Sequence, residues 1–335
     1  MLNESQQHEF WRHGVVTIND ILTPDEVAEL ITSVDLLSDD LRKEGSDEVA
    51  VHLQEITIRN SIFRSLAKSP KLTSAVASLL GPDLQLHHSK LATKPPQENK
   101  GGVCWHQDFP FFPHTNTSLV AVMVMLDDAT PLNGCMYVIP GSHKLGPLDH
   151  HIDGWFTRCC QESLPENITP SSEADLIAVT PSAGGISIHH CLALHCSPPN
   201  LSDNRRRGLV FQYRTADAVQ LSGGPLSEIP ADCGWQVSGT DSGYVRCEEA
   251  AWKLPKRFST VLTNDVHKSE TIVEYLQYRP DVGYKTQEWN SSQPKELVSK
   301  KAIEASAFAL PEGQLPSLND LIPIGQRPNT GSTME

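Results

Sequence analysis

Short runs of apolar and β-branched residues dominate the chain from residue 84 onwards. Turn-forming pairs such as Pro95-Pro96, Asn133-Gly134 and Pro140-Gly141 separate these runs, so that each run is best interpreted as a strand. Many short strands with few helical patterns between them favour a sandwich or jelly roll over a parallel sheet of βαβ units. The predicted strands are residues 84–93, 119–126, 135–139, 176–180, 185–189 and 209–215.

The first forty residues follow a different pattern. Residues 4–13 are predicted to form a short helix and residues 14–18 a strand. A second helix is predicted from Pro24 to about residue 37, because Thr23 is a favourable N-cap and Pro24 suits the first helical position. The expected fold is therefore mainly β with flanking helices, around a double-stranded β-helix (jelly-roll or cupin-like) core.

We expect a single domain over residues 1–335, because no internal repeat or long low-complexity segment divides the chain. A polar insertion at residues 145–175 interrupts the strands. A long loop inside a compact domain is more often a lid or binding loop than a simple connection. The expected parts are residues 1–83 as helical and strand support, 84–218 as the jelly-roll core, and 219–335 as a C-terminal extension on the substrate side, with a helix at 295–308.

Charge and hydropathy narrow the classes of partner. The chain has 27 Lys and Arg against 41 Asp and Glu, and its formal net charge of −14 repels phosphate backbones and anionic lipid. The longest apolar run, residues 119–126, is far shorter than the roughly 20 residues that a membrane-spanning helix needs. No secretory signal is visible. We therefore expect a cytoplasmic protein with a small-molecule substrate, no nucleic acid and no membrane; the oligomeric state is not indicated.

The cysteines show no metal-binding or redox spacing. There are eight of them, and no two form a Cys-x-x-Cys pair, so the sequence supports neither a zinc knuckle nor a thioredoxin-like site. In the absence of a secretory signal, free reduced thiols are expected.

The residues that carry chemistry are His106 and Asp108, together with His195. In a strand, residues i and i+2 point to the same face, so His106 and Asp108 can reach one metal ion from one strand end. His195 follows 89 residues later, far enough for several strands to bring it back as a third ligand. Two imidazoles and one carboxylate leave coordination positions open, which is the arrangement of oxygen-activating ferrous iron.

Taken alone, His-x-Asp is a weak motif, and the chain contains a second copy at His151-Ile152-Asp153. That copy lies in the polar insertion, whereas Asp108 is followed by the strong strand 119–126, so the context favours the first copy. His189 and His190 end a predicted strand, and we expect them to pack or hydrogen-bond structurally.

The chain resembles the phytanoyl-CoA hydroxylase (phytanoyl-CoA dioxygenase) family of Fe(II)/2-oxoglutarate-dependent oxygenases over roughly residues 5–218. The resemblance lies in the ordered blocks LATKPP, WHQDFPFFP, NGCMYVIPGSHK and AGGISIHHCLALHCSPPNLSDNRRRGLVFQYRTADA. It implies a jelly-roll enzyme with iron on His106, Asp108 and His195, and with Fe(II), 2-oxoglutarate and O2 as its cofactors and cosubstrates.

The same resemblance implies where 2-oxoglutarate binds. The family places its distal carboxylate on an arginine eleven residues beyond the distal histidine, which is Arg206 here, and guanidinium suits a carboxylate because it offers two parallel hydrogen bonds. In a strand, Arg205 and Arg207 would share the opposite face. Further cosubstrate-pocket positions implied by the family are Ser197, His88, Lys90 and Met123.

Several functions remain open at this level. Related halogenases have a small residue in place of the carboxylate ligand, so Asp108 favours hydroxylation, or another oxidation of a C–H bond, over halogenation. An acyl-CoA hydroxylase is the alternative within the family, and the acidic balance favours a smaller molecule. The alternatives of other classes are a non-catalytic metal- or ligand-binding jelly roll and a zinc hydrolase, for which no dedicated general base is evident.

Overall fold

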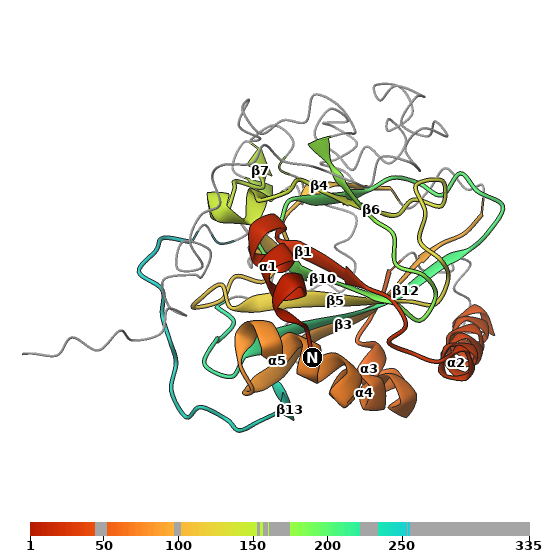
Figure 1. The fold of residues 1–335 in the computed structure, drawn as a ribbon, viewed down its shortest axis with the longest axis horizontal. Coiled ribbons are helices and arrows are strands. Elements are labelled where there is room, and N and C mark those ends of the chain that lie inside the picture. The colour runs from red at the N-terminus through yellow and green to blue at the C-terminus, as the bar shows by residue number, and fades with distance from the viewer. Residues whose placement is uncertain are drawn as a thin grey trace, which may run out of the picture.

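Two antiparallel sheets face each other in the computed structural model, which describes residues 1–43, 52–96, 102–152, 155–156, 160, 175–221, 234–252 and 254 (Figure 1). The larger sheet has the order β1-β10-β5-β12-β3-β13, and β2 also pairs with β3. Its strands are β1 (Val15–Ile18), β2 (His52–Gln54), β3 (Leu84–Lys94), β5 (Leu119–Met125), β10 (Ile186–His190), β12 (Arg206–Thr215) and β13 (Trp235–Ser238).

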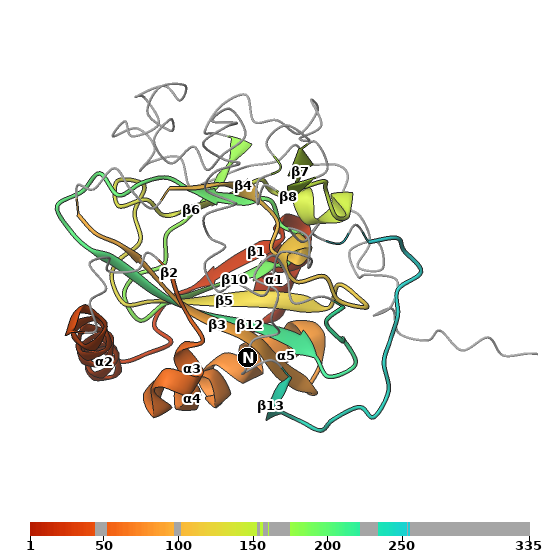
Figure 2. The ribbon, with the colours of Figure 1, turned by 180° about the vertical axis from the view of Figure 1, so that it is seen from behind.

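The smaller sheet has the order β4-β11-β6-β9 and lies over one face of the larger one (Figures 1 and 2). Its strands are β4 (Val103–His106), β6 (Met136–Val138), β9 (Ile177–Val179) and β11 (His195–Ser197). The remaining short elements are the pair β7 (His151–Ile152) and β8 (Trp155–Phe156) and the 3-10 turns η1 (Phe109–Phe111) and η2 (Ser142–Leu145).

Helices cover the other face of the larger sheet (Figure 1). They are α3 (Ile56–Arg59), α4 (Ser61–Lys68) and α5 (Pro70–Leu80), while α1 (Glu4–His13) and α2 (Pro24–Lys43) lie at its margin. Alternate residues of β12 supply this helix-facing core, where Leu209, Phe211 and Tyr213 are fully buried. The intervening residues of β12, which include Arg206 and Gln212, face the space between the two sheets.

The strand prediction is confirmed at every one of the six predicted positions, and the mainly β architecture with it. The second helix runs to Lys43, beyond the expected residue 37. Helices α3 to α5 were not predicted individually, although Asn60 and Ser69 cap α4 and α5 through their side chains.

Other sequence predictions fall wholly or partly outside the described residues. Most of the 145–175 insertion does, as does all of 295–308, and the division of the chain into parts stays a prediction. No helix in the described ranges is long and apolar enough to cross a membrane.

The expectation of free thiols is wrong for Cys104, which is disulfide-bonded. Cys135, Cys160, Cys191, Cys196 and Cys247 carry reduced thiols. The pairing had no sequence signature, because it depends on which segments the fold brings together and not on Cys-x-x-Cys spacing.

Candidate active site

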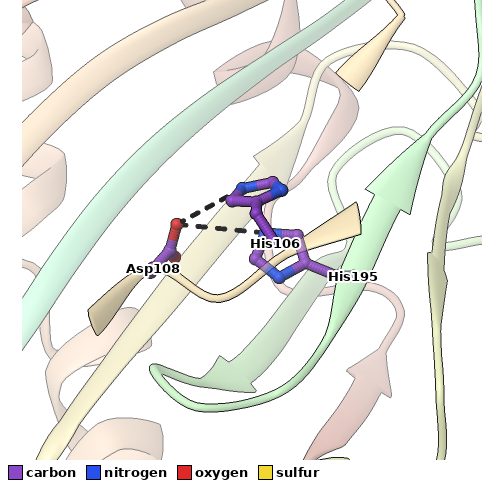
Figure 3. A group of neighbouring side chains, drawn as sticks. All are labelled: His106, Asp108 and His195. Atoms are coloured by element: carbon purple, nitrogen blue, oxygen red, sulfur yellow. Dashed lines mark ion pairs between the residues drawn. The ribbon is translucent and has the colours of Figure 1, made fainter. Parts of the chain in front are cut away.

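Three side chains converge where β4 and β11 meet. His106 ends β4 and pairs in register with His195, the first residue of β11, so that their ring centroids lie 4.0 Å apart. Asp108 follows two residues later at the start of η1. One potential ligand atom from each residue lies within 4.8 Å of the others, and Figure 3 shows the side chains pointing toward one another. Fold and motif thus bring together the three predicted metal ligands.

The two imidazoles are oriented as metal ligands. Nδ1 of His106 lies 2.8 Å from the carbonyl oxygen of Cys104, and Nδ1 of His195 lies 2.9 Å from that of Ala193. A carbonyl only accepts, so both Nδ1 atoms carry the proton and both Nε2 atoms keep a lone pair. Burial lowers the pKa of both rings, which keeps them neutral. The Nε2 atoms lie 3.8 Å and 3.9 Å from Oδ1 of Asp108.

The carboxylate of Asp108 is held so that one oxygen stays available. Its Oδ2 accepts hydrogen bonds from Nε2 of Gln212 at 2.9 Å and from Nε2 of His189 at 3.2 Å. Burial by itself raises the pKa of Asp108, but the hydrogen bond from His189 contributes to holding that pKa well below its usual range. The donor set is therefore two neutral nitrogens and one anionic oxygen, which fits a divalent metal such as Fe(II).

The turn between the ligands is fixed by residues that the sequence did not single out. The backbone N–H of Gln107 donates to Nε2 of His150 at 2.9 Å. The Gln107 side chain donates to the carbonyls of Gly146 and Leu192 and accepts from the N–H of Leu148 at 2.7 Å. The start of the polar insertion therefore packs directly on the metal-ligand turn.

His189 and its neighbour His190 offer a matched test of ligand positioning. We expect His189→Leu to weaken Fe(II) binding by roughly 10- to 100-fold, because Oδ2 of Asp108 would lose a donor that orients the carboxylate. His190→Leu should leave iron affinity unchanged, because this ring faces Trp11 and His143 instead. Anaerobic metal titration measures both, with thermal unfolding as a check on folding. Equal losses of affinity in the two variants would contradict the assignment.

A second site lies on the inner face of the larger sheet, where β3 ends and β12 begins. Arg206 and Lys94 form a register pair, and they are only 3% and 4% exposed. Arg206 Nη1 donates to the hydroxyl of Ser197 at 3.2 Å and Nη2 lies 3.3 Å from the sulfur of Met123, whereas its Nε has no partner. Lys94 donates to the same hydroxyl at 2.6 Å and to the carbonyl of Pro198.

Neither cation pairs with a carboxylate of the described residues. Burial lowers the pKa of Lys94 well below its usual range and lowers that of Arg206 as well. Two buried cations side by side cost free energy unless an anion lies between or beside them. The arrangement is therefore complementary to a carboxylate supplied by a ligand.

The predicted cosubstrate residues divide into two groups. Arg206, Ser197 and Met123 lie together, and their role in binding the cosubstrate stays a prediction. Lys90 is half-buried and His88 is buried further along β3, and their assignment to the cosubstrate stays a prediction. Lys94 was missed as a site residue, although it lies in the LATKPP block that carries the family resemblance.

The face predicted for the neighbouring arginines is confirmed. Arg207 donates to both carboxylate oxygens of Asp127, and Arg205 and Arg207 each lie 3.5 Å from Asp35 on the outer side. The competing motif lies only partly in the described residues: Nδ1 of His151 lies 2.8 Å from Oδ1 of Asp149, and Asp153 lies outside them, so the choice against this motif stays a prediction.

The C-terminal extension reaches the metal side of the molecule. The ring of Trp252 packs edge-on against Phe109, the residue after Asp108, with centroids 5.0 Å apart. Glu248 accepts hydrogen bonds from the backbone and hydroxyl of Thr117, both at 2.9 Å. Part of the extension thus covers the turn that carries the ligands.

Comparison with known proteins agrees with this geometry. A family model described as phytanoyl-CoA dioxygenase matches residues 10–208. The probable alpha-ketoglutarate-dependent hypophosphite dioxygenase of Stutzerimonas stutzeri is 32% identical over 267 residues, which cover 75% of this chain and 91% of that protein. The ectoine dioxygenase of Halomonas elongata is 30% identical over 246 residues, covering 64% of this chain and 71% of that protein.

Solved structures support the same fold. The non-haem monooxygenase ThoJ in its apo form superposes with a TM-score of 0.58 at 25% identity, covering 82% of this chain and 97% of that one. The non-haem alpha-ketoglutarate-dependent carbocyclase SnoK from nogalamycin biosynthesis gives 0.56 at 26% identity, covering 71% of this chain and 94% of that one. The chain therefore belongs to the phytanoyl-CoA dioxygenase family of non-haem iron, 2-oxoglutarate-dependent oxygenases.

Proposed function

We propose that this protein is an Fe(II)- and 2-oxoglutarate-dependent dioxygenase that oxidises a C–H bond of a small organic molecule. His106, Asp108 and His195 hold the iron, and Arg206, Lys94 and Ser197 hold the distal carboxylate of 2-oxoglutarate. The observation that carries the proposal is the combination of a buried two-histidine, one-carboxylate set with buried cations that lack an anionic partner among the described residues.

Iron and 2-oxoglutarate, when bound together, supply the oxidising power that breaks a C–H bond while 2-oxoglutarate and O2 yield succinate, CO2 and the oxidised product. The chain contributes binding and orientation. His106 and His195 offer neutral Nε2 atoms, and Asp108 offers one oxygen because Gln212 and His189 occupy the other. Three protein ligands leave coordination positions open for 2-oxoglutarate and O2.

The second site fixes the cosubstrate in one direction. A carboxylate between Arg206 and Lys94 receives charge-assisted hydrogen bonds, which are about twice as strong as neutral ones. Burial of both cations keeps water from competing for them. The keto-acid end of the same molecule is then free to reach the metal side.

A small substrate is favoured over an acyl-CoA. An acyl-CoA would need cations at the entrance for its phosphates, and the lysines near the site in the sequence include Lys90, Lys94 and Lys144. Lys94 is excluded from this role, since it is buried and bonded to Ser197. The relatives named above act on hypophosphite and ectoine, both small molecules.

Formation of succinate tests the proposal. Purified anaerobic protein is given Fe(II), 2-oxoglutarate and O2 with a panel of small molecules and acyl-CoA thioesters. We expect succinate above the level of the Asp108→Ala variant, and an increase with one class of the panel. Succinate at the level of that variant under every condition would exclude the oxygenase function and leave a binding protein of the same fold.

A further inference from the structure

A β-bulge on β3 turns an additional histidine toward the space between the sheets. Gln212 of β12 pairs with His88 and the next residue, Tyr213, pairs with Leu86, so His87 has no partner residue. The rings of His87 and His88 both lie against Phe112, with centroid distances of 5.7 Å and 4.9 Å. Bulges next to active sites commonly re-aim side chains in this way.

The bulged His87 borders a small cavity beside Asp108. Its polar lining consists of His87, Asp108 and Gln212, and Phe109 and Phe112 contribute to its apolar walls. The cavity volume of about 10 Å³ admits one water-sized group. Asp108 is the member of the predicted ligand set that lines the cavity, so a group bound there would contact that ligand, and the cavity is distinct from the Arg206 and Lys94 site.

Two polar atoms of the residues that line the cavity have no hydrogen-bond partner among the described residues. Nε2 of Gln212 donates a hydrogen bond to Asp108, so the remaining polar atom of its side chain is the acceptor Oε1. This oxygen is buried and has no hydrogen-bond partner among the described residues. Nδ1 of His87 is unpaired as well, and the two side chains are 2% and 3% exposed. Buried polar atoms of this kind are normally satisfied by water or by a ligand.

The chemistry of the walls selects the group that fits. Gln212 requires a hydrogen-bond donor, while the neutral imidazole of His87 can donate or accept according to its tautomer. An oxyanion without a proton would face the lone pairs of Gln212 and the carboxylate of Asp108. An ammonium would be attracted by Asp108 but repelled by a divalent metal held on that carboxylate, and also by Lys90 and Arg214, whose positive charges contribute to lowering the pKa of His88 and His87 respectively, although burial is the larger cause of both shifts.

We propose that this cavity is a subsite for a hydroxyl group of the substrate, which donates to Oε1 of Gln212 and accepts from Nδ1–H of His87. This inference rests on the proposed function and narrows it: the substrate is a compact, neutral, hydroxylated molecule whose neighbouring C–H bond faces the metal. His87 is then a specificity-determining residue.

The test uses the anaerobic holoenzyme with Fe(II) and 2-oxoglutarate, whose chelate gives a visible charge-transfer band. Ethanol, ethylammonium chloride and sodium hypophosphite are titrated as neutral, cationic and anionic probes. We expect ethanol to perturb the band with saturation, and His87→Phe to weaken its binding by about fivefold, the typical value of one hydrogen bond. His87→Gln, which keeps a donor and an acceptor, should bind ethanol within about twofold of the parent.

His143→Gln is the matched control, because His143 is also a buried histidine with an unpaired Nδ1 but does not line the cavity. It should leave the ethanol titration unchanged. A His87-dependent response to hypophosphite or ethylammonium and not to ethanol would overturn the subsite. The absence of any response to ethanol would overturn it as well. So would a response to ethanol that both His87→Phe and His87→Gln leave intact. Failure of the band itself to form with 2-oxoglutarate would instead refute the proposed function.

Discussion

Asp108→Ala is expected to abolish turnover and to weaken Fe(II) binding by more than about 100-fold, since loss of the partners of metal ligands alone costs roughly 10- to 100-fold. Asp108 is the anionic member of the predicted ligand set, and two neutral imidazoles do not offset the charge of a divalent ion. The substitution also removes the acceptor of Gln212 and His189, leaving two buried donors unpaired. Anaerobic titration with Fe(II) or Co(II) and succinate formation measure the two effects.

The competing motif supplies the control for this prediction. His151→Ala removes a histidine of the same His-x-Asp pattern, whose ring binds Asp149 and packs on Phe156. We expect this variant to keep iron affinity and turnover within about threefold of the parent, because its ion-pair partner Asp149 is exposed and such pairs contribute less than about 1 kcal/mol. Metal affinity in Asp108→Ala within threefold of the parent would refute the assignment of the ligands.

The metal site was predictable because its ligands depend on local rules. Residues i and i+2 share a face at the end of a strand, and this rule predicted that His106 and Asp108 lie together, although the structure places Asp108 just beyond β4, at the start of η1. The face of Arg206 followed from the same alternation, with Arg207 directed outward to Asp127. The alternation of side chains between the two faces of a strand is strongly specified wherever one face of the sheet is buried.

The partners of these residues were not predictable, because they come from distant strands. Nothing local assigns Gln212 or His189 to Asp108, which lies 104 and 81 residues away from them in the chain. The bulge at His87 likewise depends on the pairing of β3 with β12. Long-range pairing also explains why Lys94 was missed, since only the return of β11 brings the hydroxyl of Ser197 to it.

One strand connects the two binding sites. Arg206 begins β12 and Gln212 lies six residues further along the same face, a backbone distance of about 20 Å at roughly 3.3 Å per residue. Because Arg206 binds Ser197 and Gln212 binds Asp108, a rigid strand can set the distance between the cosubstrate carboxylate and the metal ligand Asp108. Substitutions that shift the register of β12 should therefore damage both sites together.

Arg206→Met is expected to weaken 2-oxoglutarate binding by about 30-fold to 1000-fold, the effect of losing one partner of a buried charged pair. The same substitution should stabilise the ligand-free protein by about 1 kcal/mol or more, because it replaces a buried cation beside Lys94 with an apolar side chain of similar length. Stability and affinity therefore change in opposite directions, a combination that general misfolding does not produce. Thermal unfolding with and without 2-oxoglutarate measures both quantities.

Arg207→Met is the matched control, since the neighbouring arginine faces outward and binds Asp127 with two hydrogen bonds of 3.0 Å and 2.8 Å. Loss of these charged hydrogen bonds should destabilise the fold by about 1.5–3 kcal/mol while leaving 2-oxoglutarate affinity intact. Arg206→Met is thus expected to raise stability and lower affinity for 2-oxoglutarate, whereas Arg207→Met is expected to lower stability and keep that affinity. If Arg206→Met lowered stability and kept its affinity for 2-oxoglutarate, Arg206 would be a structural residue, and the cosubstrate carboxylate would have to bind elsewhere on the inner face.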